Sequence, residues 1–439
     1  MTKPIKVVYS WIGPNGPIVN TELPNILTFS AVAETTTVSS TKFWTDDIYL
    51  RLFDKKDDYV LSSSYTVGKD DEFVFPYTLT WRIPFHNYFF PESGILEYSH
   101  MSGRVRDAVR LYNGYIILEC GPEAWVLPEQ LKAIQQYFYN PGFPLYKIIY
   151  LTGCMNAKDI YDKWCSENNI EDTRETRFNL IPYPLARYHM ANILNLFEHV
   201  EPEYNSETIP EKLFLCWNRR FRPHRTILLM ALEKLGLVDR SYYSMGDVDP
   251  EFKSHSFRHS IPIDLNNDNH YGLDNADMDT VLKKLPLVID GENEIQEMCT
   301  NATGKAKTFY ENSLVSLVTE TNWDLPHVTA TEKTFKPFVE KHPFILVGVN
   351  GALKSMHELG FKTFSEFWDE SYDEIEDFNQ RLAKIIELCK DIGTWDNEKI
   401  LDFKRRVKPI IEHNYTVMKN SSTIEITDKI KEIIKKNSQ

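Results

Sequence analysis

The chain has 439 residues, a hydrophobic content of 42% with 13% aromatic residues, and a formal net charge of −14 at pH 7. This length favours two domains over one, and this composition excludes a disordered chain. The acidic balance argues against a protein that coats nucleic acid non-specifically, although it leaves a local basic groove open.

Targeting and redox signals point to a cytoplasmic protein that does not bind membranes. No apolar run reaches the length needed to span a bilayer, and residues 1–20 lack the apolar segment of a signal peptide. The six cysteines form no CxxC pair and no regular spacing. We therefore expect reduced thiols, and neither disulfides nor a structural zinc.

Residues 1–110 carry strand signals but no recognisable chemistry. A first strand is predicted within residues 7–12, and β-rich runs follow at residues 49–53, 59–65 and 73–81. Their alternation of apolar and polar residues predicts an antiparallel elaboration of the first domain.

From Gly114 the pattern becomes an alternation of strands and helices, which predicts a Rossmann-like half. Its first strand, residues 115–118, is followed by two acids, Glu119 and Glu123. If this edge faces a cleft between two domains, either acid is a candidate general base for a substrate hydroxyl. Burial would have to raise its pKa toward neutrality. The alternative is a helix-capping acid and a solvated turn.

The second half begins at residues 212–217, after a polar, turn-rich linker at residues 195–211. This strand is followed, before and inside the next helix, by a cluster of cations: Arg219, Arg220, Arg222, His224 and Arg225. Cations at a helix N-terminus repel one another unless an anion lies between them, which predicts a pyrophosphate site. Ion pairs between domains or contact with a polyanionic acceptor would also account for them.

Residues 241–289 are expected to contain a strand at 241–245, a long loop at 250–285 and a short strand at 285–289. Two Asp-x-Asp triplets, beginning at Asp247 and Asp277, suggest a divalent metal ion. We predict no metal, because Asp-Pro turns are common and the second triplet stands in sequence that is typical of a loop.

The central stretch, residues 313–351, predicts a βαβ unit. An apolar run at 314–318 reads as a buried strand, Thr331 as the N-cap of a helix, and residues 344–347 as a second strand. His342 and Pro343 end the helix between them.

Ligands of such units bind at the carboxyl ends of the strands, beside helix N-termini. The chain places five polar residues there, namely Glu320, Thr321, Glu332, Lys333 and Lys336. The acids suit the hydroxyls of a ribose or a sugar, and the lysines suit a diphosphate. A salt-bridged helix start in an ordinary α/β core is the alternative.

Beyond Gly351 the pattern predicts only helices, the last three at residues 372–391, 397–418 and 423–436. We therefore expect three parts. Residues 1–205 form an acceptor-side Rossmann-like domain, residues 206–400 a donor-binding Rossmann-like domain, and residues 401–439 C-terminal helices.

The ordered set of motifs resembles GT-B glycosyltransferases. The segment from Glu320 to Lys333 is similar to the donor-binding motif of family 10 α-1,3-fucosyltransferases and of exostosin-like enzymes. The wider set also resembles a family of putative glycosyltransferases of tailed phages, and runs over residues 149–153, 218–225, 332–333 and 358–364. One departure is Thr329, which stands where the fucosyltransferases have a tyrosine, so that UDP-sugars are as open as GDP-fucose.

The resemblance implies an α/β fold with two Rossmann-like domains facing a cleft and C-terminal helices crossing back. It also implies a nucleoside-diphosphate sugar donor, with Arg225 and Lys333 at its diphosphate, and a metal-independent transferase without a cofactor. The phage likeness implies a hydroxymethylated base of double-stranded DNA as acceptor, in a host cytoplasm. A glycan or protein acceptor, or a non-catalytic nucleotide- or sugar-binding protein, stays open, whereas the absence of GxxxxGK[ST] and of a GxGxxG after a strand argues against P-loop and nicotinamide enzymes.

Overall fold

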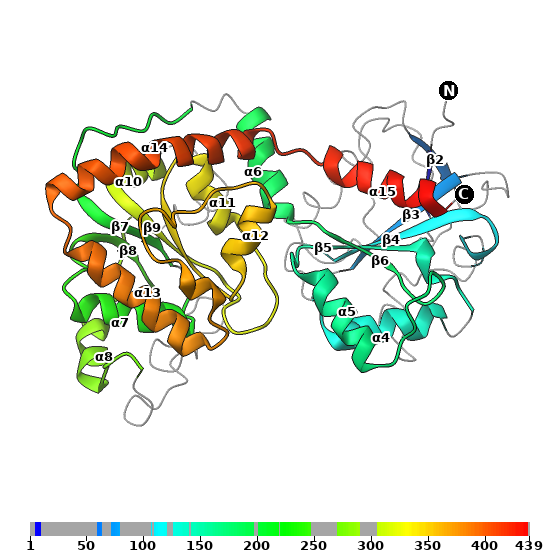
Figure 1. Ribbon diagram of the computed structural model, residues 1–439, viewed down its shortest axis with the longest axis horizontal. Helices are drawn as coiled ribbons and strands as arrows, with labels where there is room; N and C mark the ends of the chain where they lie inside the picture. Colours follow the sequence, from blue (N-terminus) through cyan, green and yellow to red (C-terminus); the bar gives the residue numbers. More distant parts are fainter. Residues whose placement is uncertain are drawn as a thin grey trace, which may run out of the picture. The chain divides into compact units, whose positions relative to one another are not determined.

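The computed structural model describes residues 5–9, 59–63, 72–79, 107, 109–120, 126–139, 142–196, 201–218, 220–246, 270–289 and 305–437 (Figure 1). The chain divides into two compact units, one of residues 1–185 with 422–439 and one of residues 186–421. Each unit contains a parallel sheet, so the predicted α/β class is confirmed. The division falls earlier than residue 205, and the polar linker expected at 195–211 lies inside the second unit.

The sheet of the first unit has six strands in the described part of the chain, in the order β2-β1-β3-β4-β5-β6. All neighbouring strands are parallel. The strands are β1 (Ile5–Tyr9), β2 (Tyr59–Ser63), β3 (Glu72–Leu79), β4 (Asn113–Cys120), β5 (Ile148–Thr152) and β6 (Asn179–Pro182). Every residue of β5 is buried, as expected for a parallel strand covered on both faces.

The antiparallel elaboration expected before residue 110 is wrong for the strands that the structure describes. β1 pairs in parallel with both β2 and β3, and β3 pairs in parallel with β4. Alternation of apolar and polar residues shows that a strand has two different faces, but it does not show the direction of its neighbours. The three strands therefore extend the Rossmann-like sheet.

Helices α4 (Pro128–Ile134), α5 (Ala157–Glu167) and α15 (Ile424–Asn437) belong to the same unit as this sheet. A single π-helical turn, Gln135–Tyr139, continues α4. The buried residues of α5 are Ala157, Tyr161, Trp164 and Cys165, the spacing of one apolar helix face.

Helix α15 is the last element of the chain and returns to the first unit. It contacts β6, and the hydroxyl of Tyr115 in β4 donates to the carbonyl of Ile434 over 3.4 Å. In Figure 1 the red α15 lies beside the strands of the first sheet. The expected return of a C-terminal helix is confirmed.

The second unit is built on a four-stranded parallel sheet in the order β10-β9-β7-β8. Its strands are β7 (Lys212–Trp217), β8 (Ser241–Ser244), β9 (Ser313–Thr319) and β10 (Phe344–Val347). Its helices are α6 (Leu185–Leu196), α7 (Pro223–Lys234), α8 (Asn275–Leu282), α10 (Lys305–Glu311), α11 (Glu332–Val339), α12 (Ala352–Glu358), α13 (Phe378–Gly393) and α14 (Asn397–Lys419). The parallel unit β9–α11–β10 is the βαβ unit expected from the central stretch.

Two expectations between residues 250 and 289 are wrong. The segment expected as a loop contains α8, whose N-cap Asp274 accepts from the backbone N–H groups of Ala276 and Asp277 in a capping box. The Asp277 triplet is thus part of a helix start and not of a loop. The strand expected at 285–289 is only an isolated antiparallel bridge between Met245 and Leu287.

The four cysteines whose side chains are described, Cys154, Cys165, Cys216 and Cys389, are free and buried. Among the described residues, no helix combines the length and the apolar character that crossing a membrane requires.

Candidate functional site

The topology of the second sheet marks one point at its edge. The chain passes from β7 through α7 to β8 in one direction, and from β9 through α11 to β10 in the other. Right-handed crossovers therefore place α7 and α11 on opposite faces of the sheet. The carboxyl ends of β7 and β9, which are neighbours, form the switch point where α/β sheets bind ligands.

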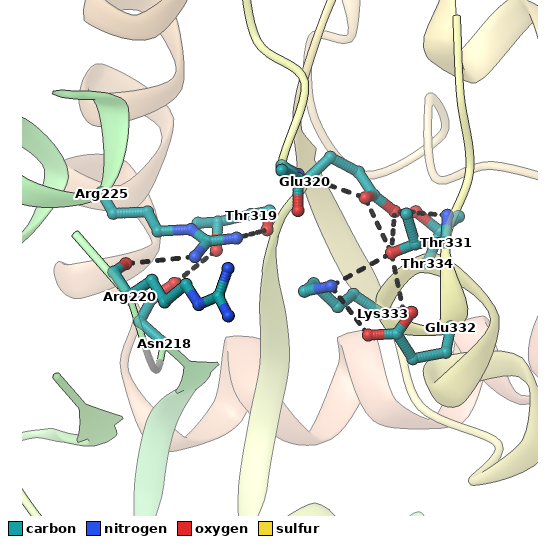
Figure 2. A network of polar contacts seen from close by, with 10 residues as sticks. Asn218, Arg220, Arg225, Thr319, Glu320, Thr331, Glu332, Lys333 and Thr334 are labelled. Atoms are coloured by element: carbon teal, nitrogen blue, oxygen red, sulfur yellow. Dashed lines mark hydrogen bonds and ion pairs between the residues drawn. The ribbon is translucent and has the colours of Figure 1, made fainter. Parts of the chain in front are cut away.

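The start of α11 is attached to the end of β9 through Glu320. One carboxylate oxygen, Oε1, accepts from the backbone N–H of Thr331 over 2.9 Å and from the hydroxyl of Thr334 over 2.5 Å. The hydroxyl of Thr331 also donates to this carboxylate, at 2.8 Å to Oε2, and accepts from the N–H of Lys333 over 3.3 Å. Glu320 is 2% exposed, so these contacts fix the first turn of α11 relative to β9 (Figure 2).

Glu332 and Lys333, the first two residues of α11, form an ion pair at the surface of the switch point. Lys333 Nζ lies 2.7 Å from Glu332 Oε1, and their side chains are 29% and 30% exposed. Burial alone would raise the pKa of Glu332, but the ammonium groups of Lys333 and Lys336 lower it below its usual value. Glu332 is therefore a carboxylate at neutral pH, able to accept from ligand hydroxyls.

Helix α7, on the opposite face of the sheet from α11, contributes Arg225. This residue lies in the first turn of α7 and is almost entirely buried, at 4% exposure. Its guanidinium donates to the carbonyls of Thr319 over 3.0 Å and Arg220 over 3.1 Å, while its Nε is buried and makes no hydrogen bond to the described part of the chain. Burial, with the nearby Arg222, lowers its pKa to about 10, so it stays charged at neutral pH. Arg225 holds β9 and the loop after β7 together.

His224 joins the same two elements, and its role was not predicted from sequence. Its ring is fully buried, and Nε2 lies 2.8 Å from the carbonyl oxygen of Glu320. A carbonyl only accepts, so Nε2 carries the proton and Nδ1 is a bare acceptor, which is buried and has no partner among the residues that the structure describes. Burial and the nearby Arg225 lower the pKa of His224 well below its usual value, so the ring is neutral.

Two further residues shape the site and were not predicted. Asn218 accepts from the Thr319 hydroxyl over 2.5 Å and donates to the Tyr243 hydroxyl over 3.1 Å, which aligns the ends of β7, β8 and β9. Arg381 of α13 donates to the carbonyls of Gly348 and Trp323, in the segments that follow β10 and β9. The sequence signal that could have identified Asn218 is its position directly after a strand. No local pattern in the sequence indicates the role of Arg381.

The structure therefore gathers most of the predicted donor-site residues at one edge of one sheet. Arg222, half-buried, is the N-cap of α7, and Lys336 lies in the last turn of α11. Thr321 is exposed, and its backbone N–H donates to Glu320 over 3.3 Å. In Figure 2 the side chains of Arg220 and Lys333 lie on either side of β9, and the ammonium of Lys333 contacts Glu332 and Thr331.

Several predicted residues lie outside what the structure describes. Arg219, Glu123 and the first Asp-x-Asp triplet, at Asp247, fall outside the described residues, and for Glu119 only the backbone, in β4, is described. Among the residues that are described, no group of three or more His, Cys, Asp or Glu side chains is placed to hold a metal ion.

No family model matches the chain, and a search of curated proteins finds no relative. Similar solved structures include an UDP-forming α,α-trehalose-phosphate synthase from Burkholderia xenovorans, at 10% identity and a TM-score of 0.41 over 85% of this chain and 76% of that one. The N-terminal domain of a Candida albicans trehalose-6-phosphate phosphatase matches at 10% identity and a TM-score of 0.39, over 99% and 97% of the two chains. An α1,3-fucosyltransferase with GDP-fucose matches at 10% identity and a TM-score of 0.25, over 98% and 90%. Likenesses this distant say nothing of donor or acceptor.

Proposed function

We propose that this protein is a glycosyltransferase that takes its sugar from a nucleoside-diphosphate sugar. The observation that carries the proposal is the convergence of two cation-bearing helix N-termini on the switch point of the second sheet. α7 brings Arg222 with the preceding Arg220, and α11 brings Lys333 with the carboxylate of Glu332 beside it. A diphosphate flanked by a hydroxyl-bearing sugar is the ligand that such a combination fits.

In this proposal the cations have a catalytic task. Lys333, Arg222 and Arg220 bind the diphosphate and stabilise the charge that develops on the departing nucleoside diphosphate, the task that a metal ion performs in other transferases. Glu332 accepts from the ribose hydroxyls. Glu320, His224 and Arg225 act as positioning residues, because their polar atoms bind the backbone and threonines that carry the cations.

The donor nucleotide, UDP or GDP, is decided by a thermal-shift screen of the full chain with UDP, GDP, ADP and inorganic pyrophosphate, with and without manganese. A ligand present at a hundred times its Kd stabilises the fold by about 2.7 kcal/mol. We expect a shift with UDP or GDP that Lys333→Ala reduces and that manganese does not affect. Lys354→Ala, an exposed lysine on α12, is the matched control. A chain that no nucleotide stabilises would contradict the proposal.

The identity of the acceptor is a second, more specific proposal. We propose a hydroxymethylated base of phage DNA, with Glu119 or Glu123 removing the proton of the acceptor hydroxyl. The resemblance to phage proteins is the support for this acceptor, and a base inside a duplex would first have to flip out of the stack.

Transfer of radiolabelled sugar tests the acceptor directly. The chain is incubated with the nucleotide sugar that stabilises it and with hydroxymethylated DNA, unmodified DNA or a set of oligosaccharides. Label on hydroxymethylated DNA alone, lost in Glu119→Gln or Glu123→Gln, is expected. Label on an oligosaccharide would replace the DNA acceptor. Nucleotide binding without transfer to any acceptor would favour a binding protein.

A further inference from the structure

The second unit contains a cavity that is distinct from the switch point. It has a volume of about 360 Å³, within the usual range for small-molecule sites, and its lining includes Tyr204, Lys307, Tyr310, Ser313, Glu340 and Lys404. Ser313 is the first residue of β9, whereas Glu320 follows its last. A strand of seven residues is roughly 20 Å long, so this amino-edge cavity and the donor site lie at opposite edges of the sheet.

Two buried polar atoms in the lining of the amino-edge cavity have no hydrogen-bond partner among the described residues. They are Oε1 of Glu340, at the C-cap of α11, and the hydroxyl of Tyr204. Nearly all buried polar groups in folded proteins are hydrogen-bonded. Two such atoms in one cavity therefore indicate that something polar occupies it in solution.

Three lysines of the lining make polar contacts within the protein. Lys341 pairs with Glu201 at 2.5 Å and Glu412 at 2.7 Å, and Lys307 lies 3.6 Å from Glu311. Lys404 is 3% exposed and donates to the carbonyl of Thr208 over 2.6 Å. Two of these lysines are thus paired with acids, and the third is held at a main-chain carbonyl.

The two unpartnered groups are neutral near pH 7. Burial raises the pKa of Glu340 to about 8, so that its carboxyl group is largely protonated. Burial also raises the pKa of the Tyr204 phenol above its ordinary value. A protonated carboxyl and a phenol each donate and accept, which is the pattern that a hydroxyl group matches. The rings of Tyr204 and Tyr310 add apolar surface.

We propose that the amino-edge cavity binds a neutral polyhydroxylated molecule, a free monosaccharide or the end of a glycan, through the carboxyl group of Glu340 and the hydroxyl of Tyr204. This second site is independent of the nucleotide site and does not require the proposed transferase activity. It would let the protein hold a carbohydrate at a distance from the switch point.

Saturation-transfer difference NMR on the full chain tests the proposal, with glucose, galactose, mannose and xylose as probes and with glycine and inorganic phosphate as ionic comparisons. We expect at least one sugar to bind. Tyr204→Phe and Glu340→Gln should each weaken its affinity about fivefold to tenfold, the loss that follows from one hydrogen bond. Lys333→Ala, at the nucleotide site, should leave it unchanged.

Tyr242→Phe is the matched control, because the Tyr242 hydroxyl donates to Glu211 outside the cavity lining. Unfolding temperatures of all variants, measured first, separate lost binding from lost structure, and Tyr204→Phe removes a single oxygen atom. No binding of any sugar, or sugar binding that survives both Tyr204→Phe and Glu340→Gln, would overturn the proposal and leave a cavity filled by water. Binding of glycine or phosphate in place of the sugars would contradict the proposal that the ligand is neutral. Shifts with UDP or GDP in the same variants report on the donor site separately.

Discussion

The hydroxyl of Thr334 donates to Glu320 Oε1 over 2.5 Å and so joins the first turn of α11 to the end of β9. Thr331 binds the same carboxylate through its backbone N–H and its hydroxyl. A carboxylate that comes from another element thus acts on the start of the helix in the way that a capping residue does. Glu320, the acid predicted to contact the donor, holds the helix that carries Lys333.

Glu320→Ala should destabilise the second unit, because the hydroxyls of the buried Thr334 and the half-buried Thr331 and one backbone N–H lose their acceptor. We expect a loss of about 3 kcal/mol in the free energy of unfolding, measured by urea denaturation. Glu320→Gln keeps one carbonyl oxygen and should lose less. The exposed Thr321→Ala is the control and should change stability by less than about 0.5 kcal/mol. If Glu320→Ala keeps the stability of the parent but abolishes nucleotide binding, Glu320 contacts the donor directly.

Substitutions of Arg225 and Arg222 should distinguish a residue that stabilises the start of α7 from one that binds the ligand there. Arg225 donates to two main-chain carbonyls and is buried, so Arg225→Ala should lower the free energy of unfolding by about 2–4 kcal/mol. Arg222 is half-buried and donates only to the neighbouring carbonyl of Phe221 in the contacts described, so Arg222→Ala should keep stability within about 0.5 kcal/mol.

Nucleotide binding gives the complementary result. Arg222→Ala should weaken the affinity for UDP or GDP and reduce its dependence on salt, since one cation fewer faces the diphosphate. Calorimetric titrations at two ionic strengths measure both. Unchanged affinity in Arg222→Ala would remove α7 from the proposed donor site.

The βαβ unit at the centre of the second domain could be predicted because its signals are local. A β-branched run indicates β9, Thr331 begins α11 as its N-cap, and the break at His342 and Pro343 precedes β10. Each signal depends on residues within a few positions of one another. The same is true of the cations before α7.

What could not be predicted depends on residues far apart in the chain. The parallel direction of β1 to β3 follows from pairing with β4, not from their own alternation. Glu320 could be recognised as an acid after a strand, but its partners stand eleven and fourteen positions later. The amino-edge cavity joins Tyr204 to Lys404, which no local pattern connects.

The pKa of Glu340 makes stability depend on pH in a definite direction. Burial raises the pKa of Glu340 from 4.5 to about 8. The positive charges of Lys307 and Lys336 lower this pKa, and the negative charge of Glu311 raises it further. Between these two values the folded state retains a proton that the unfolded state releases, so this group makes the protein less stable as pH rises. Glu340→Gln removes the effect, so its gain in stability over the parent should grow as pH rises from about 5 to about 8 and should be on the order of 3 kcal/mol near pH 7.

Urea unfolding of the parent and Glu340→Gln across this range measures the difference. His342, whose pKa burial lowers to about 4, destabilises the fold only on acidification below its unfolded pKa and is present in both proteins. The contribution of His342 therefore cancels in the difference between the two proteins. A difference between the two proteins that stays constant with pH would mean that Glu340 is ionised as an ordinary surface acid.

The last helix should stabilise the first unit and leave the second unaffected. Ile426, Ile430 and Ile434 of α15 are buried, and α15 contacts β6. Ile430→Ala leaves a cavity at this contact and should cost about 2–5 kcal/mol. Hydrogen exchange then locates the effect: amides of β4 to β6 should exchange faster, while those of β9 and β10 keep their protection. Lys429→Ala, at the exposed neighbouring position, should change neither sheet. Equal loss of protection in both sheets would show that the two units unfold as one, and no loss in β4 to β6 would show that α15 is not part of the first unit in solution.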